Sequence, residues 1–377
     1  MNSIGTLFRL TLFGSSHGTC IGCVVDGIPP GTVIDEAAMA QDLALRKPIT
    51  GIGTPRKEDD VVEILSGVVG GRASGSPLTI IIRNANTDSS AYEKLRDVPR
   101  PGHADFTALS KYGADVDIRG GGQFSGRMTA PIVAAGTIAK KMLQDIGIKT
   151  GAYSQAIGSV LDWEERTLDD MVHIRSVSPA RAADVVIGEC MVEEILAVAA
   201  EGDSVGGIIK CVCENLPIGV GEPFFDTLEG EISKMIFAIP GVKGIEFGSG
   251  FAASLMRGSV HNDIFAVSGN DIVTETNHAG GILGGISSGM PLELRVCIKP
   301  TASIRKMQHS VSLAEMKKVE LQIGGRHDPC IVPRAVPVVE AAVAITLVDL
   351  CMRGGFFATP RVSEPVTPRV GGPSRHG

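Results

Sequence analysis

Aromatic residues are scarce in this chain. They make up 4% of its 377 residues, with one Trp and three Tyr. A ligand is therefore not expected to stack on an exposed aromatic platform. Glycine, by contrast, occurs 47 times, and a residue without a side chain lets the backbone come close to whatever it binds.

An excess of positive charge is also missing. The formal net charge is -7 and the isoelectric point is about 5.7. This balance argues against nucleic acid as the main partner, because a phosphate backbone needs a dense basic face. An anionic ligand would have to be met by local clusters of basic residues.

Long apolar runs and leader-like segments are lacking too. No run approaches the roughly 18 residues of a membrane span, and the N-terminus lacks the basic-then-apolar order of a signal peptide. With 44% hydrophobic residues, the chain is long enough to bury a large core. We expect a cytoplasmic globular protein with no membrane partner.

The eight cysteines show no disulfide pattern. They are spread along the chain, mostly within apolar runs, which is typical of reduced and buried thiols. Cys20 and Cys23 have a CxxC spacing, but no second pair completes a zinc site. We interpret them as residues of a buried strand.

Hydrophobic periodicity predicts a mixture of strands and helices. Strands are predicted at 7–13, 61–69 and 77–83, and helices at 34–47, 128–146 and 334–353. Pro131 is compatible only with the first turn of its helix, while Lys140 and Lys141 indicate a solvated side. The elements do not alternate strictly, which favours an α+β fold of layered β-α-β type over a Rossmann fold.

Two pairs of segments resemble each other in the same order. "VDGIPPG" (25–31) resembles "CENLPIG" (213–219), and "GRASGSPLTI" (71–80) resembles "GISSGMPLEL" (285–294). Similar turn chemistry can arise by chance, but the shared order favours an internal duplication within one pseudo-symmetric domain at 1–358. The Pro- and Gly-rich segment 359–377 is expected to be a disordered tail.

Four of the eight histidines lie in loops rich in small or charged residues: His17, His103, His278 and His327. Each alone is compatible with a turn histidine that bonds its own backbone. Together they indicate solvent-reachable imidazoles suited to acid or base catalysis near neutral pH. His17 follows directly after a predicted strand, in "FGSSHG", and is expected to be exposed there.

The stretch "IRGGGQFSGRMTAP" (118–131) predicts an anion site. Glycine-flanked N–H groups before a helix bind phosphate, with Ser125 adding a hydroxyl and Arg127 a charge. A tight turn requiring positive φ is the alternative. Further basic groups occur at 46–48, 55–60, 299–306 and 324–329, and together they suit a ligand with more than one phosphate or carboxylate.

Asp328, beside His327, is the best candidate carboxylate. It could serve as a base or orient a donor, although an aspartate that bonds the backbone of a turn is equally compatible. His103 and Asp105, with His327 and Asp328, could instead supply metal ligands. They lack the fixed helical spacing of a strong metal motif, so no metal site is assigned.

Several long motifs, in this order, resemble those of chorismate synthase. They are "FGSSHG" (13–18), "RPGHADF" (100–106), "YGADVDIRGGGQFSGRMTA" (112–130), "NHAGGILGGISSGMP" (277–291), "KPTAS" (299–303) and "GRHDPCIVPRAVPVVEA" (325–341). The resemblance runs from the first strand to about residue 353.

This resemblance implies a homotetrameric enzyme of layered β-α-β architecture. It would convert 5-enolpyruvylshikimate 3-phosphate to chorismate and phosphate by a 1,4-elimination, on the route to aromatic amino acids. The reaction has no net redox change, yet the family requires reduced FMN, with NADPH as a source of reduction in some members. No long insertion for a reductase is apparent, so an external flavin reductase is the expected partner.

The resemblance also implies roles for individual residues. His17 would be the acid that assists phosphate departure, His103 would protonate reduced flavin near N1, and Asp328 would help prepare flavin N5 for the C6 proton. Ser16 and Ser125 would hydrogen-bond within this network. The FMN-binding positions of the family fall on Gln123, Phe124, Ser125, Gly284, Lys299, Pro300, Thr301, Ala302, Ser303 and Arg326. Arg46 falls at a nicotinamide-phosphate or substrate contact.

The chain departs from the family pattern at three places. Ser15 replaces a Glu, Ile52 replaces an Arg, and Gln123-Phe124 replaces Arg-Ser. Each change removes a charge, and Ser15 should slightly lower the pKa of His17 unless another carboxylate compensates. Two competing hypotheses follow: a catalytically impaired FMN-binding paralogue, and a metal-dependent phosphohydrolase built on the His and Asp pairs.

Overall fold

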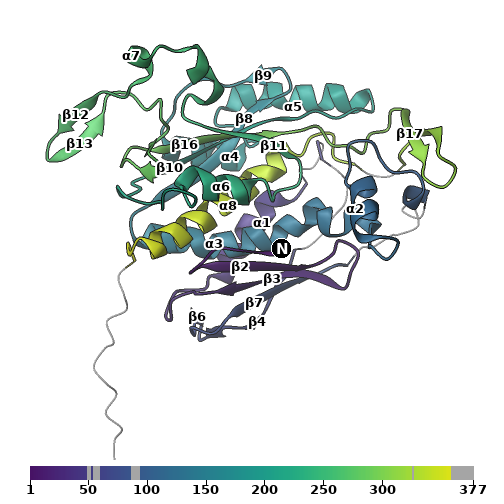
Figure 1. Ribbon diagram of the computed structural model, residues 1–377, viewed down its shortest axis with the longest axis horizontal. Helices are drawn as coiled ribbons and strands as arrows, with labels where there is room; N and C mark the ends of the chain where they lie inside the picture. Colours follow the sequence, from purple (N-terminus) through teal and green to yellow (C-terminus); the bar gives the residue numbers. More distant parts are fainter. Residues whose placement is uncertain (49–51, 54–59, 86–93, 325–326, 358–377) are drawn as a thin grey trace, which may run out of the picture.

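The computed structural model describes residues 1–48, 52–53, 60–85, 94–324 and 327–357. Two five-stranded sheets enclose a layer of helices, which gives a β-α-β sandwich (Figure 1). This architecture confirms the predicted α+β class and layered arrangement. The expected tail at 359–377 lies outside the described residues.

Both sheets are antiparallel throughout. The first has the order β1 (Ser3–Ile4), β2 (Arg9–Gly14), β3 (Cys20–Asp26), β7 (Leu78–Arg83) and β4 (Val62–Ser66). The second has the order β9 (Val160–Leu161), β8 (Lys149–Ile157), β10 (Gly207–Glu214), β16 (Leu292–Ile298) and β11 (Val242–Phe247). Alternate residues of their inner strands face the helices, as in β3, where Ile21, Cys23 and Val25 are fully buried.

Four helices fill the space between the sheets: α1 (Glu36–Arg46), α3 (Ala130–Asp145), α6 (Leu228–Ile236) and α8 (Val332–Arg353). Asp35 starts α1 by accepting a 2.9 Å hydrogen bond from the amide of Ala38. Pro131 lies in the first turn of α3, as predicted. Helices α3 and α8 cross closely at Gly136 of α3. A Cβ at this position would lie only 2.2 Å from the Cβ of Ala341, so the close approach needs a residue without a side chain.

Outside this layer lie smaller elements. Helix α4 (Leu168–Val177) packs on the outer face of β8, through a separate apolar cluster that includes Tyr153 and Leu168. The others are α2 (Asp105–Tyr112), α5 (Val185–Ala200), α7 (Gly258–His261), and the strand pairs β5 (Val68–Val69) with β6 (Arg72–Ala73), β12 (Phe265–Ser268) with β13 (Asp271–Thr274), β14 (Ile282–Leu283) with β15 (Ile286–Ser287), and β17 (Gln308–Ser312) with β18 (Lys317–Leu321).

The two halves repeat one topology. The order β2, β3, α1, β4, β7, α3 recurs as β8, β10, α6, β11, β16, α8, with α4 and α5 inserted after β8. In the first half β3 pairs antiparallel with β7, and in the second half β10 pairs antiparallel with β16. The matched sequence segments end β3 and β10 and lead into β7 and β16, so the internal duplication is confirmed.

Helix α8 is long and apolar enough, by length and composition, to cross a membrane, which the sequence analysis did not anticipate. In the fold, 94% of its most apolar window is buried. Its place between the two sheets is that of a core helix.

Lys140 of α3 is not on a solvated side, which corrects the sequence-based expectation. Its ammonium group lies 2.8 Å from Asp42 of α1 and 3.1 Å from Glu340 of α8. Glu340 also binds Arg175 of α4, and the amide of Ala152 donates to it over 3.3 Å. A charge inside the helix layer needs such partners, and helical periodicity alone does not reveal them. Lys141 remains half-exposed and pairs with Asp145.

Candidate active site

One end of the helix layer holds a cavity of about 630 Å³. It is lined where α1 ends (46–48), just before α3 (120–129), where α6 ends (237–243) and around the start of α8 (327–338). Because α1 corresponds to α6 and α3 to α8, equivalent helix ends from the two halves meet here. Segments 100–104 and 299–303 close the remaining walls.

The described lining of this cavity is strongly cationic. Seven basic side chains contribute: Arg46, Lys47, Arg100, Arg127, Lys243, Lys299 and Arg334. Two carboxylates accompany them, Asp60 and Asp328. Burial, and then the nearby Lys243, lower the pKa of Lys299. In an acidic protein, this local excess of positive charge favours an anionic ligand.

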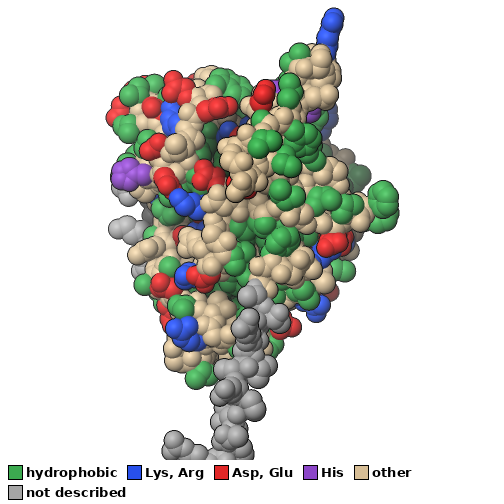
Figure 2. All heavy atoms as spheres, turned by 90° about the vertical axis from the view of Figure 1, so that its left-hand side faces the viewer, with side chains coloured by type: hydrophobic (Ala, Val, Ile, Leu, Met, Phe, Trp, Pro, Cys, Tyr) green, Lys and Arg blue, Asp and Glu red, His purple; other side chains and the backbone are tan. Residues whose placement is uncertain are grey.

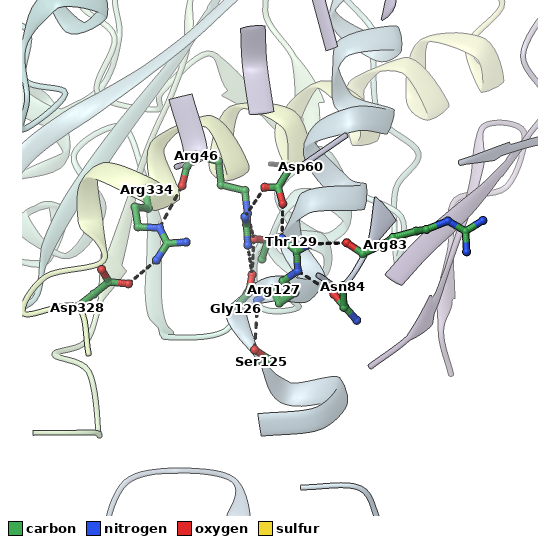
Figure 3. Close-up of polar contacts among 10 residues, drawn as sticks. All are labelled: Arg46, Asp60, Arg83, Asn84, Ser125, Gly126, Arg127, Thr129, Asp328 and Arg334. Carbon is green, nitrogen blue, oxygen red and sulfur yellow. Dashed lines mark hydrogen bonds and ion pairs between the residues drawn. The ribbon is translucent and has the colours of Figure 1, made fainter. Parts of the chain in front are cut away.

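Two arginines on the wall share one buried aspartate (Figure 3). Arg46 lies 3.1 Å from Asp60, and Arg127 binds the other oxygen of the same carboxylate. Arg46 also donates to Thr129 over 2.9 Å and to the carbonyl of Gly126 over 2.8 Å. These bonds fix both guanidinium groups against the turn that precedes α3.

Ser125 begins that turn. Its hydroxyl accepts a 3.3 Å hydrogen bond from the amide of Arg127, and Ser125 lines the cavity together with Gln123 and Phe124. The predicted anion site before α3 is therefore part of the cavity wall. The neighbouring glycines, Gly120 to Gly122, have φ values of 59°, 86° and 55°, which other residues rarely adopt.

His17 lies beneath these glycines rather than in solvent. A Cβ on Gly120 would be 2.4 Å from Nε2 of His17 and 2.8 Å from the hydroxyl of Ser16. Ser16 donates its amide to the carbonyl of Gly122 over 3.2 Å. His17 is 8% exposed, so the expectation of an exposed turn was wrong. The absence of side chains on the glycines lets the turn close over the ring.

A carboxylate near His17 comes from Asp117. Hydrogen bonds from Arg119 lower the pKa of Asp117 most, burial opposes them, and His17 adds a smaller lowering by charge attraction. The compensating carboxylate considered for His17 in the sequence analysis is thus available from the segment that precedes the glycines. The sequence analysis did not identify Asp117.

His103 lies near the same turn. A Cβ on Gly121 would be 3.5 Å from Nε2 of His103 and 3.4 Å from the Cβ of Ser125. The other ring nitrogen, Nδ1, lies 2.6 Å from the carboxylate of Asp105. His103 thus presents Nε2 towards the turn that His17 also contacts.

Asp328 lines the cavity and forms an ion pair with Arg334, which also lines it. Arg334 also donates to the carbonyl of Arg46 over 3.0 Å (Figure 3). His327 also lines the cavity; its Nε2 lies 3.1 Å from the carbonyl of Gly324, and burial lowers its pKa. Among the described residues, the His, Cys, Asp and Glu side chains form no group of three or more that could hold a metal.

The 299–303 segment meets the cavity at four residues: Lys299, Thr301, Ala302 and Ser303. Lys299 donates to the carbonyl of Gly102, and Arg100 donates to the hydroxyl of Ser303 over 3.2 Å. Pro300 is adjacent to this lining but does not contribute to it.

One described cofactor position of the prediction stands apart from this cavity. Gly284 is an exposed residue of the turn between β14 and β15 and does not line it. Arg326 lies outside the described residues. His278 also lies away from the cavity, with Nδ1 3.2 Å from the hydroxyl of Ser249.

Sequence reasoning missed four charged lining residues: Asp60, Arg100, Lys243 and Arg334. Arg100 and Arg334 lie within motifs that carried the family resemblance, so the motifs contained the signal without distinguishing these residues. Asp60 and Lys243 lie in ordinary charged and Gly-rich stretches. They reach the cavity through the fold alone.

The two-sheet fold encloses a cationic cavity, suited to a small anion, whose described lining includes His103 and His327. A sequence model of the chorismate synthase family matches residues 8–352. The chain is similar to chorismate synthase of Dehalococcoides mccartyi, with 49% identity over 362 residues, 96% of this chain and 99% of the relative. It is also similar to chorismate synthase of Korarchaeum cryptofilum, with 47% identity over 93% of this chain and 97% of the relative.

Solved structures agree with these matches. A crystal structure of chorismate synthase superposes with a TM-score of 0.75 and 27% sequence identity, covering 93% of each chain. The chain therefore belongs to the chorismate synthase family. The family comprises carbon–oxygen lyases that act on phosphates.

Proposed function

We propose that this chain converts 5-enolpyruvylshikimate 3-phosphate to chorismate and phosphate by a 1,4-elimination that requires reduced FMN. The reaction breaks the C3–O bond to phosphate and the C6–H bond, and it forms a second ring double bond. The supporting observation is the cationic cavity, with His103 in its lining and His17 against the adjoining Gly120–Gly122 turn.

The cavity residues suit a flavin phosphate together with a substrate that carries one phosphate and two carboxylates. Anions of this number need several fixed cations and N–H donors, and the wall supplies seven basic side chains. Gln123, Phe124, Ser125 and the 299–303 segment would hold FMN, and Arg46 would contact substrate or a nicotinamide phosphate. When bound, reduced FMN supplies an electron transiently, which accounts for a requirement without net redox change.

The residues of the chain would divide the proton work. His17 would donate a proton as the phosphate leaves, because a leaving dianion needs an acid. His103 would pass a proton through Nε2, the ring nitrogen near Gly121. Asp328, fixed by Arg334, would help prepare flavin N5 for the C6 proton. Ser16 and Ser125 would hydrogen-bond within this network of proton-transfer groups.

Two further proposals concern assembly and setting. The segment 250–274, which holds α7 and the β12–β13 hairpin, exposes large apolar side chains, seen among the hydrophobic atoms of Figure 2. Phe251 is 82% exposed and Leu255 is 90% exposed. Such a surface fits the proposed homotetramer.

We also propose a cytoplasmic enzyme whose flavin is reduced by an external reductase, with NADPH as the ultimate donor.

An anaerobic assay tests the activity. The protein is mixed with photoreduced FMN and 5-enolpyruvylshikimate 3-phosphate, and chorismate absorbance and phosphate release are followed together. Equal yields are expected, and His17→Ala or His103→Ala should each lower kcat about 10²-fold or more with the fold intact. Near wild-type rates in either variant would refute that residue's proton role.

The same assay separates the competing functions. FMN binding without any turnover would identify an impaired paralogue, for which the loss of charge at Ile52 gives a reason, because Ile52 is 8% exposed within the apolar core. Phosphate release that depends on added zinc or manganese, without chorismate, would identify a phosphohydrolase.

A further inference from the structure

Asp105, the first residue of α2, is a buried carboxylate that the proposed mechanism does not use. It is 1% exposed. Arg100 donates to Oδ2 from its backbone amide over 3.1 Å and from Nε over 2.7 Å. Oδ1 lies 2.8 Å from Nη2 of Arg100 and 2.6 Å from Nδ1 of His103. Burial alone would raise the pKa of Asp105, but the hydrogen bonds from Arg100 and His103 hold it well below its usual range.

These contacts decide which nitrogen of His103 carries hydrogen. A guanidinium group and a backbone amide only donate, so Asp105 must accept from Arg100. Nδ1 also lies 3.0 Å from Nη2 of Arg100, but that nitrogen has the shorter 2.8 Å contact with Oδ1 of Asp105 as its acceptor. The closest partner of Nδ1 is the carboxylate oxygen at 2.6 Å, which can only accept, so Nδ1 carries the proton. Nε2, on the side of Gly121, is then the nitrogen that accepts or delivers a proton towards the cavity.

We propose that Asp105 is a positioning residue that holds His103 in the Nδ1–H form and aims Nε2 at the reacting centre. Arg100 locks the carboxylate, and its 3.2 Å bond to Ser303 joins this lock to the 299–303 wall. The effect on turnover rests on the proposed function, whereas the effect on the imidazole does not.

Asp105→Asn is the discriminating substitution, because it changes one atom. The two donors of Arg100 at the Oδ2 position require an oxygen there. The Oδ1 position meets only one donor of Arg100, Nη2 at 2.8 Å, so the amide NH₂ is better placed there, at the loss of that one bond. It then faces Nδ1 of His103 and donates to it, which drives the proton to Nε2. An equivalent aspartate-to-asparagine change at a catalytic histidine is known to impose the wrong tautomer.

The first measurement is on the protein without FMN, labelled with ¹⁵N at histidine. Long-range ¹H–¹⁵N spectra report the tautomer, and the His103 signal is assigned from its loss in His103→Gln. We expect the Nδ1–H form in the wild type and the Nε2–H form in Asp105→Asn. A wild-type His103 in the Nε2–H form would overturn the proposal, even if the variant failed to fold.

The second measurement is steady-state turnover. Asp105→Asn should lower kcat about 10²-fold and change the substrate KM little, with no further loss of kcat in the His103→Gln background. Asp162→Asn is the matched control, because Asp162 is 0% exposed and pairs with Arg166 away from the cavity. An equal loss of kcat in that control, or an additive loss in the double variant, would mean that Asp105 only stabilises the fold.

The two hypotheses fail separately. A wild-type protein that makes no chorismate would refute the proposed function, and the tautomer of His103 would still decide the role of Asp105. Chorismate formation with an unchanged tautomer in Asp105→Asn would refute the positioning role alone.

Discussion

Two buried ionic clusters use similar groups in different surroundings. In the first, Glu340 lies between Lys140 and Arg175 within the helix layer. In the second, Asp60 lies between Arg46 and Arg127 at the cavity wall. Both place one carboxylate between two cations, which satisfies the buried charge.

The difference lies in what surrounds the cations. Lys140 of α3, Arg175 of α4 and Glu340 of α8 bridge three helices, and none of these three side chains lines the described cavity. Arg46, Arg127 and Asp60 all line it. The first cluster therefore contributes to stability, whereas the second holds its cations in place for a ligand. Substitution in each cluster should affect a different measured quantity.

The largest effect is expected from Arg127→Ala. Removal of a positioned cation from an anion site costs about 2–5 kcal/mol, so kcat/KM should fall by roughly 10²-fold or more. Arg127→Lys should recover part of this loss, because it restores the charge without the forked geometry. Unchanged steady-state kinetics in Arg127→Ala would place the ligand elsewhere in the cavity.

The next effect is expected from Glu340→Gln. It leaves Arg175 and Lys140 without their shared carboxylate, which should lower the free energy of unfolding by about 3 kcal/mol. Urea denaturation measures this change. The folded variant should bind FMN with wild-type affinity, and a weakened affinity would show that the two clusters are coupled.

A smaller effect follows from pH. Burial alone would raise the pKa of Glu340, but Arg175 and Lys140 lower it from 4.5 to about 2. The carboxylate therefore contributes its full stability above about pH 4.5 and loses it as the pH falls towards 2. Denaturation at a series of pH values should show this decline, and it should be shallower in Glu340→Gln. Equal slopes in the two proteins would assign acid unfolding to other carboxylates.

The last prediction concerns Gly120→Ala, which adds a single methyl group. The new methyl group would meet the ring of His17 at a φ of 59°, so the ring or the turn must shift. We expect lower kcat with a modest loss of stability, whereas Gly113→Ala, which also has positive φ but meets nothing within 4 Å, should leave kcat unchanged. Equal kinetics in both would show that the contact with His17 is not needed.

The secondary structure and the duplicated topology were largely predictable from the sequence, because the patterns that indicate them are local. The alternation in 7–13 and the periodicity of 334–353 gave the type of β2 and α8, and the repeated turn segments gave the duplication. The interior position of Lys140 was not predictable, because its partners Asp42 and Glu340 are distant in sequence. Helical spacing identifies a face without showing what covers it.

The site was predictable in its motifs and not in its geometry. His103, Ser125 and Asp328 were named from loop chemistry or resemblance, and they line one cavity. The burial of His17 was missed because it results from a turn about a hundred residues later in the chain. Lys243 was missed because nothing local distinguishes it from a solvated lysine.

The meeting of equivalent helix ends at the cavity has an evolutionary consequence. The site lies where the duplicated halves face each other, so each half offers the ligand a wall of the same backbone construction. On one wall, Ser125 and Arg127 precede α3, while on the other Asp328 precedes α8 and Arg334 lies in its first turn. A single ancestral unit, paired with its copy, would already have enclosed such a cleft. Divergence then needed to change side chains at a few helix ends, without building a new fold.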